Sequence, residues 1–448
     1  MNGNNQLLRS AALALTLLSL VLTTRAAQVI TWPAPVGEPL ATNYQVTVEG
    51  KPVPVYIAPS VHGGDYAFAT FDFTGKVKVT VTGSPKLAAA AILPKSAGLT
   101  PKNDGNTLTL TLDHPCKLSI EPDGINSPLL LFANAPEKDA PQPTDPNVVY
   151  FGPGIHKPER IVLKAGQTLY LAGGAVVKGA IIAEKADHLR ICGRGILDGT
   201  DWPWLKGPAG HMVRIQDSKD VTIQDIIIRG SFAWTVVPMR CAQVNIRNIK
   251  IVASRVQNDD GINPCNSQDV LIEDCFVRTD DDCVALKGLA HLNTPPTPVR
   301  NITVRRCIFW CDRARIFLLG HESQASAMEN LLYQDCDIVH FVMTPFLLEP
   351  GEEMPLRHAR FENLRLAGQG LGDFITLQPT VNQYMKVKTP GSLSNIVFKD
   401  ITLQADTPGK ARLLVRGTDA AHQVNQVIFD NVLRYGQPLT ATSSNVTI

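Results

Sequence analysis

Two short stretches of this sequence carry an unusual concentration of carboxylates. Gln257–Asn263 contains Asp259 and Asp260, and Arg278–Val284 contains three consecutive aspartates, Asp280 to Asp282. Crowded carboxylates raise one another's pKa, so such a patch keeps some carboxyl groups protonated while others stay ionised. Cleavage of a glycosidic bond needs that combination, because one carboxyl group protonates the leaving oxygen and another activates water. Several carboxylates in one place also suit Ca²⁺.

Aspartate has a purely structural use as well, since its side chain hydrogen-bonds the nearby backbone in turns. This alternative applies mainly to Asp259 and Asp280. A turn needs one aspartate rather than three in a row, so the set as a whole favours chemistry.

The elements that position these residues follow from a repeat. The phrase apolar-x-apolar-x-(Asp/Asn)-x-x-apolar recurs at intervals of about 23 to 37 residues, beginning at Val221, Val244, Val270, Ile302, Leu331, Ala359, Ile396 and Val427. Each phrase holds two short strands around a polar turn, and only stacking of successive phrases buries a continuous core. The Asp or Asn suits a left-handed turn conformation. We therefore predict a parallel β-helix over residues 148–448. Equivalent positions of its neighbouring coils lie about 4.8 Å apart, which brings the two acidic stretches into one patch.

The region before the repeat has a different pattern. Residues 27–135 alternate apolar and polar side chains in short runs bounded by Gly and Pro, for example in 44–48 and 77–82, which predicts a small β-sandwich. Residues 136–147 are rich in Pro and form a predicted linker. Residues 1–26 contain an apolar run followed by small residues, the layout of a signal peptide, so we expect a secreted or periplasmic protein.

Composition excludes several partners. The 448 residues carry 42 Lys and Arg against 41 Asp and Glu, with no basic stripe, so no nucleic-acid binding is expected. No segment is long and apolar enough to predict a membrane span. The nine Cys show no CxxC spacing, so we predict no metal site and no cofactor. Three of them, Cys275, Cys307 and Cys336, share one position of the repeat and are expected to stack as small buried residues.

The acidic stretches also carry a family resemblance. Asn258-Asp-Asp-Gly-Ile262 and Asp281-Asp-Cys-Val-Ala-Leu-Lys287 resemble the Asn-x-Asp-Gly and Asp-Asp-Cys motifs of polygalacturonases, and the context 231–238 is similar too. Dextranases, a sister family, resemble this chain in their leading β-sandwich and at the entry to the helix, residues 149–179. The resemblance implies an all-β fold, a right-handed parallel β-helix preceded by a β-sandwich, and an inverting glycoside hydrolase acting on an α-linked polysaccharide or oligosaccharide. By position it implies that Asp281 is the general acid and that Asp260 and Asp282 activate water.

The sequence departs from polygalacturonases after these motifs. Their His-Gly motif is replaced by 311–316, which contains no His, and their later Arg-x-Lys pair, which grips the galacturonate carboxylate, corresponds to 347–349 and ends in Glu349. An acid replacing a cationic clamp predicts a neutral or only partly charged substrate. The residues expected to contact the sugar are Asn258, Lys287, Arg313, Arg315, His321 and Glu349.

Two other functions remain open on the same fold. A Ca²⁺-dependent polysaccharide lyase needs a strong base, for which Lys287, Arg313 and Arg315 are candidates. A carbohydrate-binding β-helix without catalysis needs the sugar contacts but no acid or base.

Overall fold

The computed structural model describes residues 27–83, 87–292, 296–368, 372–405 and 408–440, together with the backbone of Val446–Thr447. The predicted signal peptide lies outside the described residues. The fold is almost entirely β, with three short 3₁₀ helices in the described ranges, η1 (Leu87–Ala89), η2 (Lys95–Ala97) and η3 (Ala290–Leu292). No helix in these ranges has the length and apolar character needed to cross a membrane.

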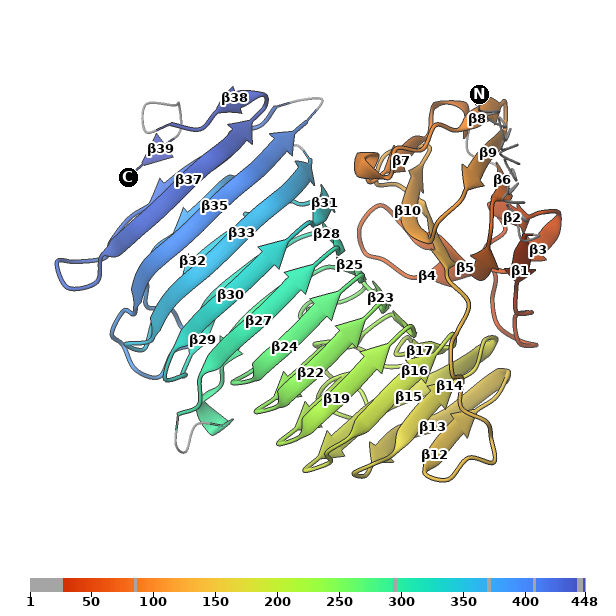
Figure 1. Ribbon diagram of the computed structural model, residues 1–448, viewed down its shortest axis with the longest axis horizontal. Coiled ribbons are helices and arrows are strands. Elements are labelled where there is room, and N and C mark those ends of the chain that lie inside the picture. Colours follow the sequence, from red (N-terminus) through yellow and green to blue (C-terminus); the bar gives the residue numbers. More distant parts are fainter. Residues whose placement is uncertain are drawn as a thin grey trace, which may run out of the picture.

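The first part of the chain forms the predicted β-sandwich (Figure 1). One sheet contains β1 (Gln28–Ile30), β4 (Val55–Ala58), β5 (Tyr66–Thr74), β7 (Ala91–Leu93), β10 (Cys116–Glu121) and β11 (Leu129–Asn134). The other contains β2 (Tyr44–Val48), β3 (Lys51–Val53), β6 (Val77–Gly83), β8 (Lys102–Asp104) and β9 (Thr107–Leu112). Alternate side chains of both sheets face inward, as the period-two pattern predicts, and form a shared apolar core.

The second part is a right-handed parallel β-helix whose coils stack in register. Its first face consists of β12 (Val148–Phe151), β14 (Thr168–Leu171), β16 (Leu189–Gly193), β19 (Lys219–Gln224), β22 (Ala242–Arg247), β24 (Gln268–Glu273), β27 (Val299–Arg305), β30 (Met328–Gln334), β33 (Pro355–Ala367), β35 (Ser392–Gln404) and β37 (Val424–Arg434). Its second face consists of β17 (Ile196–Asp198), β20 (Ile227–Arg229), β23 (Lys250–Val252), β25 (Phe276–Thr279), β28 (Ile308–Cys311) and β31 (Asp337–His340).

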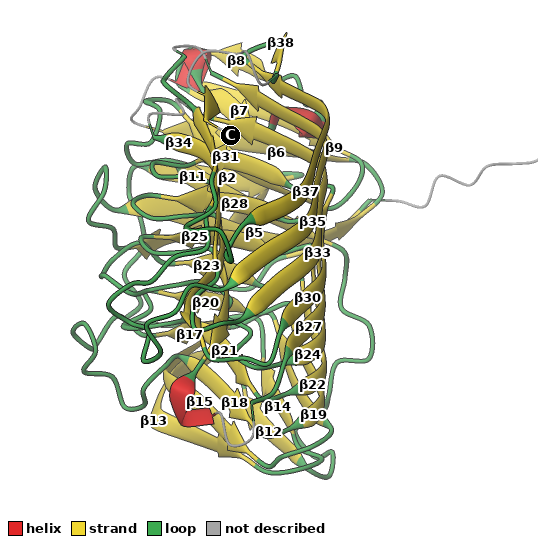
Figure 2. Ribbon diagram, turned by 90° about the vertical axis from the view of Figure 1, so that its left-hand side faces the viewer, coloured by secondary structure: helices red, strands yellow, loops and turns green. Residues whose placement is uncertain are grey.

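The third face carries the residues of most interest. It consists of β18 (Val213–Gln216), β21 (Val236–Met239), β26 (Val284–Gly288), β29 (Phe317–Ser323), β32 (Phe346–Glu349), β34 (Asp373–Leu377), β36 (Arg412–Val415) and β39 (Val446–Thr447). Between β21 and β26, Ile262 and Cys265 continue the ladder as isolated bridges. The long strands β13 (Gly154–Leu163) and β15 (Ala175–Glu184) bend across two faces, and β33, β35 and β37 continue from the first face onto the second, where β33 pairs with β31. The short strand β38 (Gln437–Pro438) pairs antiparallel with β37. Figure 2 shows the coils stacked along one axis.

The repeat phrase behaves as predicted. Its Asp or Asn has positive φ in coil after coil, for example 72° at Asp225, 49° at Asn248 and 55° at Asp335. Neighbouring side chains form the expected ladder, since Asn248 Nδ2 donates to Asp225 Oδ1 at 2.7 Å. The next residue of each phrase points into the core, where Cys275, Cys307 and Cys336 are buried as free thiols and stack on one another.

The sandwich packs against the second face of the β-helix, beside β17, β23, β25, β28 and β31 (Figure 1). Sandwich residues that include Tyr66, Phe68 and Phe132 meet Phe276 and Trp310 in one apolar cluster. Three buried basic side chains of the β-helix find polar partners on the sandwich, Arg194 with Asp72, Arg229 with Glu38 and Lys250 with Asn134. Because separating such partners would leave buried charges unpaired, the two parts are firmly joined. The exact division of the chain at residues 26, 135 and 147 stays a prediction.

Candidate functional site

The acidic stretches lie in the turns that lead from the second face to the third. Parallel bridges join Val236 to Ile262 and Ile262 to Val284, and Val284 pairs with Phe317. The residues two positions before each of these therefore form a column across four coils, Trp234, Asp260, Asp282 and Arg315. Backbone bonds confirm this register, since Gly261 N–H donates to the Asp282 carbonyl at 2.8 Å and Cys283 N–H to the Arg315 carbonyl at 2.9 Å. The structure thus brings the two stretches together as the repeat predicts.

Each of the three carboxylates expected to act in catalysis has its own cation. Lys287 Nζ lies 3.6 Å from Asp260 Oδ2, Arg313 NH2 lies 3.1 Å from Asp281 Oδ2, and Arg315 NH1 lies 3.4 Å from Asp282 Oδ1. The Asp260 and Asp282 side chains are 2% and 3% exposed, whereas the Asp281 side chain is 11% exposed. Asp281 is therefore the carboxyl group that a bound molecule reaches most directly.

Further hydrogen bonds fix these carboxylates. Asn263 Nδ2 donates to Asp260 Oδ2 at 2.9 Å, while Asp260 Oδ1 is buried without a protein partner. Asp281 accepts the backbone N–H of Asp282 at 3.0 Å and, more distantly, Asn258 Nδ2 at 3.5 Å. The unpartnered Asp260 Oδ1 is an acceptor that a bound water or sugar hydroxyl could satisfy.

The environment shifts the pKa values of the two deeper carboxyl groups. Burial raises the pKa of Asp260 well above its usual value; Lys287 opposes this shift, and Asp281 and Asp282 add to it. Burial also raises the pKa of Asp282 to about 6; the Arg315 cation lowers this pKa, and the Asp281 carboxylate raises it further. Near neutral pH the two deeper carboxyl groups can therefore hold a proton on one of them while the other is ionised and able to accept a proton.

The other two aspartates differ from each other in role. Asp259 is fully buried and accepts four backbone N–H groups, those of Ser254, Arg255, Asp280 and Asp281. It thus fulfils the structural alternative and ties the two turns together. The Asp280 carboxylate instead binds two side chains, His62 Nε2 at 2.5 Å and Arg313 Nε at 2.6 Å.

Three of the residues expected to contact the sugar form a relay behind Asp282. Arg315 donates to Asp282 through its backbone N–H at 3.1 Å and donates through NH2 to His321 Nε2 at 2.8 Å. His321 Nε2 is then an acceptor, so the neutral ring carries its proton on Nδ1, which lies against Glu349 Oε1. Burial, with Arg315 and Lys287, lowers the pKa of His321 to about 3, in keeping with a neutral ring. Glu349 and His321 therefore hold Arg315 in place.

Lys287 belongs to a second group of contacts. Its ammonium also binds Glu322 at 3.2 Å and lies 4.6 Å from the centre of the Trp234 ring. The His211 ring stacks on the Trp234 ring, with the two ring centres 5.1 Å apart and the ring planes tilted by 6°. Sequence reasoning missed Trp234 and His211 as site residues. Trp234 could have been found from the register of the repeat, because it precedes Val236 as Asp260 precedes Ile262, but nothing in the sequence points to His211.

His62 was also missed, and no sequence signal points to it because it lies in the sandwich. It lines a groove of about 990 Å³ between the sandwich and the β-helix, together with Glu121, His340, Phe341 and others. The groove also touches Asp312, but Asp260, Asp281 and Asp282 are outside its lining. The groove and the carboxylate patch are therefore separate features of the surface, and His62 borders both. Within the described ranges, no three His, Cys, Asp or Glu side chains are arranged to hold a metal ion.

The raised pKa of Asp260 leads to a prediction about stability. A carboxyl group with a raised pKa in the folded state binds more protons there than when unfolded, so the free energy of unfolding falls as pH rises above about 4. Asp260→Asn removes this cost, while Lys287 keeps Glu322 as its partner. We expect the variant to have a Tm about 3 °C above wild type at pH 8, with the difference vanishing near pH 4.

Thermal unfolding at both pH values checks this expectation. The control Asp430→Asn changes an aspartate whose side chain is 59% exposed and should leave the Tm unchanged at both. A lower Tm for Asp260→Asn at pH 8 would mean that attraction to Lys287 outweighs the cost of burial.

Residues 156–307 match the family described as glycosyl hydrolases family 28. The matched segment includes Asp260, Asp281, Asp282 and Lys287 and ends before Arg313. Similar curated proteins include a probable polygalacturonase from Vitis vinifera, 29% identical over 143 residues, and a polygalacturonase from Juniperus ashei, 39% identical over 117 residues. These alignments cover 29% and 23% of this chain and only 28% and 23% of the relatives' own lengths. The resemblance to polygalacturonases predicted from the motifs is confirmed.

Solved structures resemble the chain over nearly its whole length. Dex49A from Penicillium minioluteum has a TM-score of 0.65 at 14% identity, covering 92% of this chain and 94% of its own. A family 28 exopolygalacturonase from Yersinia enterocolitica has a TM-score of 0.53 at 14% identity, covering 94% and 95%. These likenesses establish the fold, a β-sandwich followed by a right-handed parallel β-helix.

Proposed function

We propose that this protein is an inverting glycoside hydrolase that cleaves an α-linked polysaccharide or oligosaccharide. The observation that carries the proposal is the patch of Asp260, Asp281 and Asp282 on adjacent coils, each paired with a different cation, within the segment that matches glycosyl hydrolases family 28. The polygalacturonase names of the relatives support the same class of reaction.

The roles within the patch follow from exposure and partners. Asp281 is the general acid, because it is the most exposed of the three and Arg313 stabilises the carboxylate it becomes after giving up its proton. Asp260 and Asp282 lie deeper and hold the attacking water. As the bond between the anomeric carbon and the leaving oxygen breaks, the water oxygen bonds to that carbon, one of these two carboxylates takes the water proton, and Asp281 protonates the leaving oxygen.

The two alternatives receive less support from the same contacts. A Ca²⁺-dependent lyase needs several carboxylate oxygens free for the ion and a cation free to act as base. Here Lys287, Arg313 and Arg315 are each bound to carboxylates, so neither condition is met without rearrangement. A binding protein without catalysis gives no account of buried carboxyl groups with raised pKa values, which cost stability.

A substrate of this class also bears on location. A polysaccharide is met outside the cell or in the periplasm, so the predicted secreted or periplasmic location belongs to the proposal.

The experiment that tests the proposal is a screen of the purified protein on neutral and acidic polysaccharides, reading new reducing ends and ultraviolet absorbance. Proton NMR of the earliest product on the best substrate is expected to show inverted anomeric configuration, because water attacks the face opposite the leaving group. Retained configuration would contradict the water-activating roles of Asp260 and Asp282. A product absorbing through a new C=C bond would support the lyase instead.

A further inference from the structure

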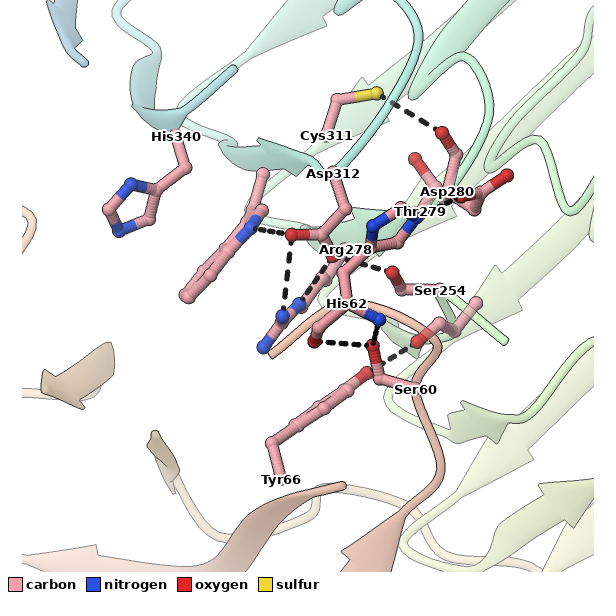
Figure 3. A network of polar contacts seen from close by, with 12 residues as sticks. Ser60, His62, Tyr66, Ser254, Arg278, Thr279, Asp280, Cys311, Asp312 and His340 are labelled. Atoms are coloured by element: carbon pink, nitrogen blue, oxygen red, sulfur yellow. Dashed lines mark hydrogen bonds and ion pairs between the residues drawn. The ribbon is translucent and has the colours of Figure 1, made fainter. Parts of the chain in front are cut away.

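One loop of the sandwich reaches the carboxylate patch. It comprises residues 59–65 between β4 and β5, and it contacts the β-helix coil that carries Asp260. Val61 N–H donates to the Ser254 carbonyl at 3.0 Å, and the Tyr66 hydroxyl, just after the loop, donates to the Ala253 carbonyl at 2.8 Å. At its tip, His62 Nε2 lies 2.5 Å from Asp280 Oδ1 (Figure 3).

The contacts of His62 continue to the general acid. The second oxygen of Asp280 accepts Arg313 Nε at 2.6 Å, and NH2 of the same guanidinium donates to Asp281 Oδ2 at 3.1 Å. The Arg313 side chain is 42% exposed, so packing does little to hold it. These two carboxylates define its position, and the Asp280 carboxylate is oriented in turn by His62.

The loop is built to hold His62 in one place. The Ser60 hydroxyl donates to the His62 carbonyl and accepts the His62 N–H, at 2.9 and 3.0 Å. Gly63 has φ of +69°, and a Cβ there would lie 2.8 Å from the Ile125 carbonyl oxygen, so the next residue fits only as glycine.

The coil on the other side of this contact is equally fixed. The buried Arg278 guanidinium lies between the rings of Tyr66 and Trp310, at 4.1 and 3.8 Å, and binds Asp312 at 2.9 Å (Figure 3). Ser254 Oγ donates to the same carboxylate at 2.5 Å. The sandwich is thus joined rigidly to both turns of the active site.

We propose that His62 is a positioning residue for the general acid Asp281, acting through Asp280 and Arg313, and that the sandwich is in this way part of the catalytic unit. The inference rests on the proposed function. When Asp281 gives its proton to the leaving oxygen, the new carboxylate needs the Arg313 guanidinium beside it. Loss of His62 frees the Asp280 carboxylate to rotate and to draw Arg313 away. This change reduces the stabilisation of the transition state more than it reduces the affinity for substrate.

The test compares two substitutions of His62. His62→Ala removes the donor and is expected to lower kcat about 10-fold with little change in KM, because displacement of a catalytic group acts on the transition state. His62→Gln places an amide N–H near the position of Nε2 and is expected to restore most of kcat. The matched control His114→Ala removes an exposed sandwich histidine that pairs with its neighbour Asp113, and it should be without effect.

A crystal structure of His62→Ala provides a readout that needs no substrate. The Arg313 NH2 group is expected to have left Asp281 Oδ2, with the Tm unchanged within a few degrees. An Arg313 that stays in place, or Ala and Gln variants that both match wild type in kcat, would overturn the role of His62 and leave the hydrolase proposal intact. If instead wild type cleaves no glycan, the proposed function fails, and the position of Arg313 still decides whether His62 orients it.

Discussion

Replacing Asp281 by asparagine is expected to lower kcat by about 10²-fold or more, with the protein still folded. Asp260→Asn and Asp282→Asn should cause losses of similar size, since they remove the groups that hold and deprotonate water. The asparagine amide fills the same space but neither releases nor accepts a proton near neutral pH. Initial rates on the best substrate of the screen, together with the Tm of each variant, measure the two effects separately.

Asp259→Asn and Asp280→Asn provide the comparison. Asp259 accepts four backbone N–H groups, so its replacement should lower the Tm more than it lowers kcat. Asp280→Asn keeps one oxygen as an acceptor and should lower kcat only about 10-fold, by loosening Arg313. Equal and large losses at all five positions, reversed by added Ca²⁺, would instead support a metal site.

Stability and activity should move in opposite directions at Asp260. Burial raises the pKa of this group because the folded protein pays a cost to keep it charged. The asparagine variant is therefore expected to be more stable at pH 8 and nearly inactive. A residue with only a structural role would lose both properties together.

The sequence was sufficient for the β-helix because the repeat phrase encodes local geometry. Its Asp or Asn adopts the left-handed conformation at Asp225, Asn248 and Asp335, and the following apolar residue fills the core. Phrases of this kind fix the register of the first two faces. They also place Asp260 directly beside Asp282, because the turns that carry them occupy equivalent positions of neighbouring coils.

The partners of the carboxylates could be predicted only in part. Lys287, Arg313 and Arg315 were expected to contact the sugar, yet each is bound to a carboxylate of the patch. Their side chains are long and cross between coils of different length, so sequence spacing does not tell which carboxylate each one meets. His62 lies 218 residues from its partner Asp280 and in a different β structure, and only the packing of the sandwich brings them together.

The charge balance of the patch predicts its substrate. The patch holds three cations, Lys287, Arg313 and Arg315, and five carboxyl groups that contact them directly, those of Asp260, Asp280, Asp281, Asp282 and Glu322. A sixth carboxyl group, that of Glu349, contacts His321, which binds Arg315. A uronate needs a cation that is free to bind its carboxylate. The match to glycosyl hydrolases family 28 also ends at residue 307, before the stretch in which polygalacturonases are expected to carry their cationic clamp.

We therefore expect weak or absent activity on polygalacturonate and a preference for a neutral or only partly charged polymer. Glu349→Gln tests the cause, because glutamine keeps an oxygen to accept the proton of His321 Nδ1 and removes only the charge. One charge several ångströms from another is worth about 1–3 kcal/mol in a partly buried site, or roughly 10- to 100-fold in kcat/KM. The variant should gain on acidic oligosaccharides by up to this factor and lose on neutral ones, whose hydroxyls bind a carboxylate more strongly than an amide.

The control for this substitution is Glu353→Gln, the same chemical change at an exposed position four residues further along. It should leave the ratio of kcat/KM on neutral and acidic oligosaccharides as it is in wild type, because a solvated charge is screened. A gain on acidic sugars in both variants would point to the overall charge of the surface rather than to Glu349. Robust cleavage of polygalacturonate by wild type would show that one of the three cations leaves its carboxylate to bind the uronate, and the inferred preference for a neutral sugar would be wrong.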